Sequence, residues 1–168
     1  LYCVEILHHS TGWRIPVSPS WILHEGTRTI LTLKPNRKLK RFDFEVIVGA
    51  SAADYNKAAE GNLKKGYVTF SNGDSEQRIS ISDIRSDVSR THDQKSENAL
   101  RRWSASDVAP RPDDTFGERL CAVRWTAAKT GREYFTVPNT FDEAIEDELN
   151  TIVHSSLSKW QRDGSVPD

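Results

Sequence analysis

Short turn signals between β-rich segments are the feature that most constrains the fold of this sequence. Clusters of glycine, asparagine, aspartate, serine and threonine are flanked on both sides by β-branched and aromatic residues. Such clusters join neighbouring strands into antiparallel hairpins, because their residues accept the backbone conformations of a tight turn. The turns fall at residues 10–12, 71–74 and 130–131, and the strands at 1–8 and 13–17, 67–70 and 78–81, and 120–125 and 133–137.

A fourth predicted hairpin carries the most basic segment of the chain. Apolar and polar residues alternate over residues 42–48, and residues 28–33 are the expected partner strand across residues 34–40. Such a loop can neutralise several phosphate groups, so that affinity falls steeply with salt. A solvated turn is the commoner role of a charge run, and both interpretations stay open. The segment contains five cations: Lys34, Arg37, Lys38, Lys40 and Arg41.

Five tryptophans occur in a chain whose hydrophobic fraction is only 36%. Most of them are expected in the core, because a small core gains much from large rings. Trp13 lies beside the first turn, where its ring could stack on a nucleic-acid base. The candidate DNA-binding residues are therefore Trp13 and the five cations.

Two helices are expected. Ser51 caps a short helix near residues 51–60, which Gly61 ends. Thr140 and Glu143 have the spacing of a capping box and begin a longer helix over about residues 141–163, which Gly164 ends. At 1.5 Å per residue this helix is roughly 35 Å long, longer than a small core needs, so part of it is expected to dock elsewhere. Its apolar face consists of Ala144, Ile145, Leu149, Ile152, Val153, Leu157 and Trp160.

These elements predict the α+β class, with antiparallel β-hairpins, a short helix and a long C-terminal helix. The β-rich part spans residues 1–138 and includes a polar loop at 87–98 that we expect to be mobile. The amphipathic helix at 139–164 belongs to the same domain. A single domain with a small core fits the length of 168 residues.

Composition narrows the setting of the chain. It has no methionine and opens inside a β-rich segment, so we expect a fragment of a larger protein. The net charge is −1, so nucleic-acid binding requires a local basic patch. Two cysteines, Cys3 and Cys121, make no disulfide framework, which favours a cytoplasmic location. No apolar run approaches the ~20 residues of a membrane span, so no membrane partner is expected.

Metal-binding and catalytic motifs are sparse. Cys3, His8 and His9 lie near the first turn, but zinc needs four close ligands and the second turn offers only Asp74. The sequence lacks a phosphate-binding glycine loop, Gly-x-Ser-x-Gly and the Asp/Asn-Pro-Pro-Tyr motif of amino-methylating enzymes. We therefore assign no catalytic, cofactor-binding or metal-binding residue, and expect no cofactor in this fragment.

Three stretches follow one another in order over nearly the whole chain. They are Thr11-Gly12-Trp13 with Pro16 and Pro19-Ser20-Trp21-Ile22; Pro110-Arg111-Pro112-Asp113-Asp114 with Glu118-Arg119-Leu120 and Arg124-Trp125; and Trp160-Gln161-Arg162 with Gly164, Val166 and Pro167. Together they resemble the mid-chain insert of large adenine-specific DNA methyltransferases that carry a zinc-ribbon-like segment.

The resemblance implies a zinc-ribbon-like scaffold of paired hairpins and a methyltransferase domain in the flanks, as in restriction-modification enzymes. It implies S-adenosylmethionine as the cofactor of the parent enzyme. The family usually carries a Cys-Pro pair before each of two hairpin turns. His8-His9 and Ser71-Asn72 stand at those positions here, which implies that zinc has been lost while the scaffold remains.

We therefore expect a DNA-binding or positioning module of an adenine-N6-specific DNA methyltransferase, not catalytic by itself. Its expected partners are DNA and the flanking methyltransferase domain. The alternative is a protein–protein interaction or scaffolding module of a larger intracellular protein, whose long helix packs on a partner while the basic loop is only solvated. A metal hydrolase built on the scattered histidines is a third alternative.

Overall fold

The computed structural model describes residues 1–86, 100–104, 107 and 109–165, so the polar loop expected at 87–98 lies outside the described residues. Strands and helices are numbered separately in chain order. The strands are β1 (Tyr2–His8), β2 (Trp13–Val17), β3 (Ile22–His24), β4 (Thr29–Asn36), β5 (Arg41–Ile47), β6 (Leu63–Lys64), β7 (Tyr67–Ser71), β8 (Glu76–Ser80), β9 (Phe116–Leu120), β10 (Val123–Thr126) and β11 (Glu133–Thr136). The helices are α1 (Ala52–Glu60), α2 (Ile81–Arg85) and α3 (Thr140–Arg162).

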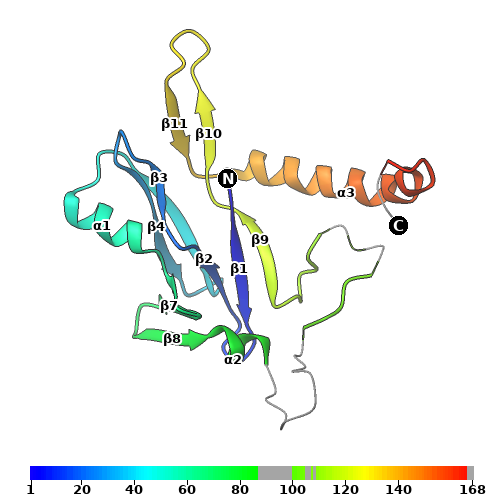
Figure 1. Cartoon of the computed structure of the whole chain (residues 1–168), viewed down its shortest axis with the longest axis horizontal. Coiled ribbons are helices and arrows are strands. Elements are labelled where there is room, and N and C mark those ends of the chain that lie inside the picture. The colour runs from blue at the N-terminus through cyan, green and yellow to red at the C-terminus, as the bar shows by residue number, and fades with distance from the viewer. Residues whose placement is uncertain (87–99, 105–106, 108, 166–168) are drawn as a thin grey trace.

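The strands form small antiparallel sheets, and α3 leads away from them (Figure 1). Within the described residues the strand orders are β2-β1-β9, β3-β4-β5, β6-β7-β8 and β10-β11. This arrangement confirms the predicted α+β class with antiparallel hairpins. It also confirms α1, which begins after the Ser51 cap and ends at Gly61.

All four predicted hairpins are present: β1 pairs with β2, β4 with β5, β7 with β8, and β10 with β11. The loop predicted at residues 34–40 is too long, because the ladder of β4 and β5 continues to the pair Asn36–Arg41. Only residues 37–40 form the turn, and Lys40 adopts a left-handed φ of +49° there. Lys34 and Arg41 therefore lie in strands.

β9 was not predicted as a separate strand. Leu120 was expected to begin the third hairpin, but it ends β9, and β10 begins at Val123. β9 pairs antiparallel with β1, so that Cys3 lies opposite Arg119. This pairing joins two parts of the chain that are remote in sequence and completes the sheet around β1.

α2 replaces the end of an expected strand. Ile81 was assigned to the strand that returns from the second turn, but Ser80 ends β8 and caps a helix. The Ser80 hydroxyl accepts a hydrogen bond from the Asp83 amide at 3.0 Å, which satisfies one of the free N–H groups of the first turn. Ile84 of this helix is buried in the core.

Buried side chains form two clusters. The first lies where the β1–β2 hairpin, β5, β7 and α2 meet, and its members are Ile6, Trp13, Ile15, Val17, Phe42, Val68, Phe70 and Ile84. The second lies around β3, β4, α1 and the end of β9, and its members are Trp21, Ile30, Leu31, Ala50, Ala58, Cys121 and Ala122. The β-rich part therefore owes its packing to hairpins that cover one another.

α3 is one continuous helix, as predicted, but its capping box lies one residue earlier than expected. Asn139, not Thr140, is the N-cap: its side-chain oxygen accepts from the amides of Phe141 and Asp142 at 2.8 and 3.2 Å. Asp142 Oδ2 in turn accepts from the Asn139 amide at 2.9 Å. Thr140 is already helical, so its hydroxyl cannot act as the cap.

The other end of α3 closes as Gly164 predicted. The Ser165 amide donates to the Trp160 carbonyl at 2.8 Å, and the Gly164 amide donates to the Gln161 carbonyl at 3.0 Å. These two bonds form a Schellman motif, which needs a left-handed residue, and Gly164 has φ of +67°. No helix in the described part of the chain is both long enough and apolar enough to cross a membrane.

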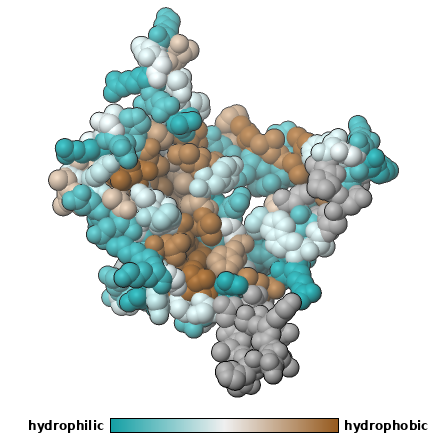
Figure 2. Space-filling model, viewed as in Figure 1, coloured by the Kyte–Doolittle hydropathy of each residue, from teal (hydrophilic) through white to brown (hydrophobic). Residues whose placement is uncertain are grey.

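The apolar face of α3 is exposed. Ile145, Leu149 and Ile152 share one side of the helix and are 40%, 55% and 47% exposed. Figure 2 shows apolar surface along the first half of α3. An amphipathic helix normally packs such a stripe against a core, and here the described residues leave much of it uncovered.

Substitution of Gly61 tests the close packing between the end of α1 and the segment that leads into β3. Its φ is +58°, and a Cβ atom at this position would lie 2.3 Å from the Ser18 carbonyl oxygen and 2.5 Å from that of Pro19. We expect Gly61→Ala to lower the free energy of unfolding by more than about 2 kcal/mol in urea denaturation, because the backbone must move.

Gly49→Ala is the matched control for this variant. Gly49 also has positive φ, +69°, but nothing lies within 4 Å of its Cβ position. It therefore bears only the backbone cost of about 1–2 kcal/mol. Equal losses in the two variants would contradict the close approach at Gly61.

Candidate nucleic-acid interface

Three hairpin turns meet at one end of the structure. The β4–β5 turn lies between the other two. Arg37 Nε donates to the Asn72 carbonyl at 3.3 Å, and the Arg37 guanidinium also pairs with Asp74, both in the β7–β8 turn. On the other side, Lys40 Nζ donates to the Thr11 carbonyl of the β1–β2 turn at 2.9 Å. We call this surface the turn end; it comprises residues 8–12, 37–40 and 71–75.

The five predicted cations do not form one free cluster on the turn end. Lys34 lies on β4 and pairs across the hairpin with Glu45 at 2.9 Å. Arg41 contacts the carboxylate of Glu5 on β1. Arg37 and Lys40 tie neighbouring turns together. Lys38 is exposed, and the described residues give its side chain no ion pair or hydrogen bond. Exposed ion pairs contribute little to stability, so an external phosphate can compete for Lys34 and Arg37.

Trp13 is not available to a nucleic-acid base. Its residue is 7% exposed, and its ring lies 5.3 Å from the ring of Phe42 in a tilted contact. Alternation along β2 places Trp13, Ile15 and Val17 on the same inner face, where all three are buried. The prediction that Trp13 contacts DNA is therefore wrong, because its ring is part of the core.

Three arginines surround one buried carboxylate near the turn end. Glu5, on β1, is 3% exposed. Its Oε1 lies 3.2 Å from Arg119 Nη1, and its Oε2 lies 3.3 Å from Arg41 Nη2 and 3.7 Å from Arg14 Nη1. Burial lowers the pKa of the Arg119 guanidinium, and the charge of Arg41 lowers it further. We call Arg14, Arg41 and Arg119 the arginine cluster.

Sequence reasoning missed Arg14 and Arg119, although it named Arg41. The pairing of β1 with β2 and β9 brings the two missed residues to Glu5, and the β9 pairing has no local signal. One signal was present: Glu5 stands between Val4 and Ile6 in a predicted strand. A carboxylate that is buried in a strand needs a cationic partner. The sequence therefore predicts that Glu5 has such a partner, but not which residue it is.

A second charge cluster lies on the segment before β9, and it is balanced. The two arginines Arg101 and Arg111 face the two carboxylates Asp107 and Asp114. Arg101 contacts both carboxylates at 2.6 Å, and Arg111 Nη2 lies 2.8 Å from Asp107. The Ser104 amide and the Arg101 guanidinium hold the pKa of Asp107 well below its usual range. Arg101 does the same for the pKa of Asp114.

The histidines of the first turn are engaged in hydrogen bonds. His8 contacts the Thr11 hydroxyl through Nδ1 at 2.7 Å and the Ser10 hydroxyl through Nε2 at 3.0 Å. His9 Nε2 lies 3.0 Å from the Thr115 hydroxyl. Burial lowers the pKa of His8. Within the described ranges, no three His, Cys, Asp or Glu side chains are grouped so that they could hold a metal ion.

The two cysteines are brought together by the pairing of β1 with β9. Both are free thiols, Cys121 being buried and Cys3 half-buried. The neighbouring Cys121 sulfur, together with burial, raises the pKa of the Cys3 thiol, while the Cys3 thiol lowers the pKa of Cys121. Neither thiol is exposed on the turn end.

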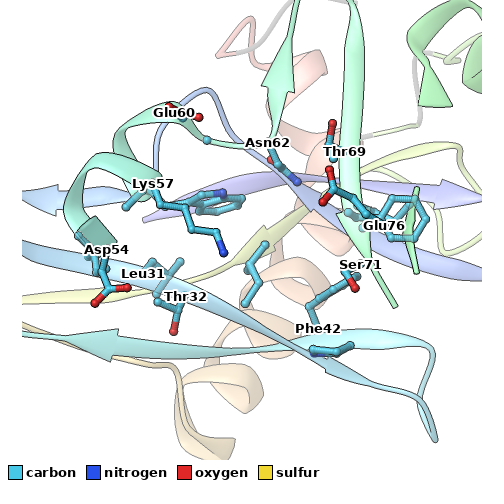
Figure 3. Close-up of a pocket in the computed structure, with 18 of the residues that line it drawn as sticks. Leu31, Thr32, Phe42, Asp54, Lys57, Glu60, Asn62, Thr69, Ser71 and Glu76 are labelled. Carbon is cyan, nitrogen blue, oxygen red and sulfur yellow. The ribbon is translucent and has the colours of Figure 1, made fainter. Parts of the chain in front are cut away.

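A groove of about 550 Å³ lies between α1, β4 and β7 (Figure 3). Leu31 and Phe42 contribute to its apolar lining, and Lys57 extends into it from α1. Charges of both signs line its edges, and the pair Glu60–Lys64 is closed at 2.6 Å. The groove therefore lacks the excess positive charge that a nucleic acid needs.

No protein-family model, no curated protein and no solved structure matches this chain.

The balanced cluster makes stability depend on pH. The folded-state pKa values of Asp107 and Asp114 lie below the unfolded value near 3.9. Their stabilising contribution is therefore complete above about pH 5 and is lost as pH falls through the folded values. We expect the free energy of unfolding to fall less steeply between pH 5 and pH 3 in Asp114→Asn than in the parent, measured by urea titration.

Asp113→Asn is the control, because Asp113 is the exposed neighbour and forms no ion pair within the described residues. Its pH profile should match that of the parent. A parent-like slope in Asp114→Asn would contradict the role of the cluster.

Proposed function

We propose that this chain is a DNA-binding or positioning module of an adenine-N6-specific DNA methyltransferase and carries no catalytic group itself. The closeness of the β1–β2 and β7–β8 hairpins beside their turns carries the proposal. In the family that the sequence resembles, these two turns bear the Cys-Pro pairs. His8, at the first of those positions, lies with its ring 6.3 Å from the ring of Phe70, directly before Ser71 at the second.

The contacts at the turn end support a zinc-ribbon-like scaffold that has lost its metal. A structural zinc holds two hairpin turns together through four ligands. Here the Arg37–Asp74 pair and the Lys40 bond to Thr11 link the β4–β5 turn to the turns on either side of it. In this proposal, such polar contacts take the place of the metal in holding the turns together.

DNA binding by this scaffold rests on local positive charge. The backbone amide of Arg14 donates to the Lys40 carbonyl at 2.9 Å, so the arginine cluster adjoins the basic turn. Phosphate neutralisation by these residues releases condensed counterions and gives affinity without reading sequence. The module would therefore position DNA, while sequence recognition comes from elsewhere.

The methyl donor would bind outside this chain. S-adenosylmethionine is the cofactor implied for the parent enzyme, and glycine-rich turns between a strand and a helix commonly hold such nucleotides. The described strand-to-helix turn from β5 to α1 contains a single glycine, Gly49. These residues do not fit the cofactor, so we assign it to the flanking methyltransferase domain.

α3 is the element that would dock on that domain. Its stripe of Ile145, Leu149 and Ile152 is exposed, and a stripe of this kind is used for helix-in-groove contacts. The same observation favours the second candidate, a protein–protein interaction or scaffolding module. The two candidates differ in whether the turn end binds DNA.

Lys38 gives the cleanest test of DNA binding, because its side chain makes no ion pair or hydrogen bond with any residue that the structure describes. We expect Lys38→Ala to weaken duplex binding and to lower the slope of log affinity against log salt by about 0.9, the value for one lost phosphate contact. Fluorescence anisotropy at several salt concentrations measures both. The triple change of Arg37, Lys38 and Lys40 to alanine removes up to three phosphate contacts. It should therefore lower the slope by up to about three times that amount.

Lys129→Ala is the matched control, since Lys129 is also exposed but lies in the β10–β11 turn. It should bind duplex like the parent. Parent-like binding by the triple variant would leave the basic turn as solvation and favour the scaffolding module.

A substitution in α3 tests whether its apolar stripe is free for a partner. Leu149 is 55% exposed, so Leu149→Asp should change the free energy of unfolding by less than about 0.5 kcal/mol. It should also reduce the fluorescence of a bound apolar dye. Asn150→Asp adds the same charge beside the stripe and should leave the dye signal unchanged. A loss above about 2 kcal/mol in Leu149→Asp would show that the stripe packs on this domain.

A further inference from the structure

We propose that the arginine cluster is a binding site for one phosphate group of the DNA backbone, and that Glu5 is the buried carboxylate that holds this site together. The inference rests on the proposed function and extends it, because two of the three residues, Arg14 and Arg119, lie outside the basic segment of residues 34–41. It names where a phosphodiester would bind and which side chains would hold it.

The arginine cluster carries more positive than negative charge. Among the described residues, three guanidinium groups share one carboxylate, which leaves an excess of two positive charges. The cluster of Arg101, Arg111, Asp107 and Asp114 provides a comparison within the same molecule, because its two cations face two carboxylates. One cluster is complete by itself, and the other has unsatisfied positive charge.

The arginine–carboxylate distances also differ between the two clusters. In the balanced cluster the arginine–carboxylate contacts are 2.6–2.8 Å, the usual length of a charge-assisted hydrogen bond. Around Glu5 the corresponding contacts are 3.2–3.7 Å. Arg41 Nε is also buried and finds no hydrogen-bond partner in the described part of the chain. Donor capacity is therefore left over in the arginine cluster.

Exposure rises from the carboxylate outward. The side chain of Glu5 is 4% exposed, while those of Arg119, Arg14 and Arg41 are 18%, 26% and 40% exposed. An anion arriving from solvent would thus meet Arg41 and Arg14 first. Glu5 lies beneath them, where it offsets part of their mutual repulsion.

Two of the arginines are held in place before any ligand binds. Arg119 Nη1 donates to the Phe42 carbonyl at 2.7 Å, and its guanidinium lies 4.5 Å from the centre of the Phe44 ring. Arg14 Nη2 donates to the Pro112 carbonyl. A guanidinium that is already oriented loses little entropy when its planar fork binds a phosphate.

The experiment compares the parent with Arg41→Gln and with Arg124→Gln as control. Arg124 is an exposed arginine on β10, where a 3.8 Å contact joins it to Glu133. Duplex DNA is titrated by anisotropy at several salt concentrations. Arg41→Gln should weaken binding of all duplex sequences alike and lower the salt slope by about 0.9, while Arg124→Gln should behave like the parent.

A second arm uses inorganic pyrophosphate as the probe, with ionic strength held constant by chloride. Pyrophosphate should raise the unfolding temperature of the parent and of Arg124→Gln, because a ligand that binds only the folded protein stabilises it. It should not raise the unfolding temperature of Arg41→Gln, which lacks part of the site. This arm also checks folding, since each variant must show a cooperative transition without the anion.

The two arms separate the site from the proposed function. If the parent binds duplex while Arg41→Gln shows the same affinity and salt slope, the phosphate site is wrong and the DNA module stands. If the parent binds no duplex, the proposed function and the DNA phosphate as ligand both fail, whatever pyrophosphate does. A pyrophosphate shift that is equal in the parent and Arg41→Gln also overturns the site.

Discussion

The pairing of β1 with both β2 and β9 is the interaction on which the rest of this structure depends. It places Glu5 in the middle of a sheet, where an ionised carboxylate is costly unless cations and hydrogen bonds surround it. Arg14 from β2 and Arg119 from β9 meet that need, and Arg41 joins them from β5. One buried charge thus links β1 to three other strands and gathers the basic surface that we propose binds DNA.

Contacts between turns help to keep the hairpins of this chain of modest apolar content together. The β1–β2 turn lies against the β4–β5 turn, and the β4–β5 turn lies against the β7–β8 turn through Arg37 and Lys40. Two of the predicted DNA-binding cations therefore also have a structural role. A phosphate that competes for these side chains would also loosen contacts between turns, so binding and local stability are coupled at the turn end.

Local signals in the sequence predicted most of the elements but few of their distant contacts. Turn residues predicted three hairpins, alternation of apolar and polar residues predicted the fourth, and Ser51, Gly61 and Gly164 predicted where helices begin and end, because these effects act over a few residues. The β1–β9 pairing has no such signal, so the arginine cluster was missed. Trp13 was assigned to DNA although alternation along β2 places it with Ile15 and Val17 on the inner face. Basic residues were counted correctly, but their internal partners come from remote segments.

The central claim is that the turn end and the arginine cluster bind duplex DNA, and a nuclear magnetic resonance titration of the isotope-labelled chain tests it most directly. With a short duplex added at low salt, the account predicts that amide and arginine side-chain signals shift at residues 10–14 and 37–41 and at Arg119. The signals of α3 should stay in place. Shifts confined to α3, or no shifts at any residue, would contradict the account.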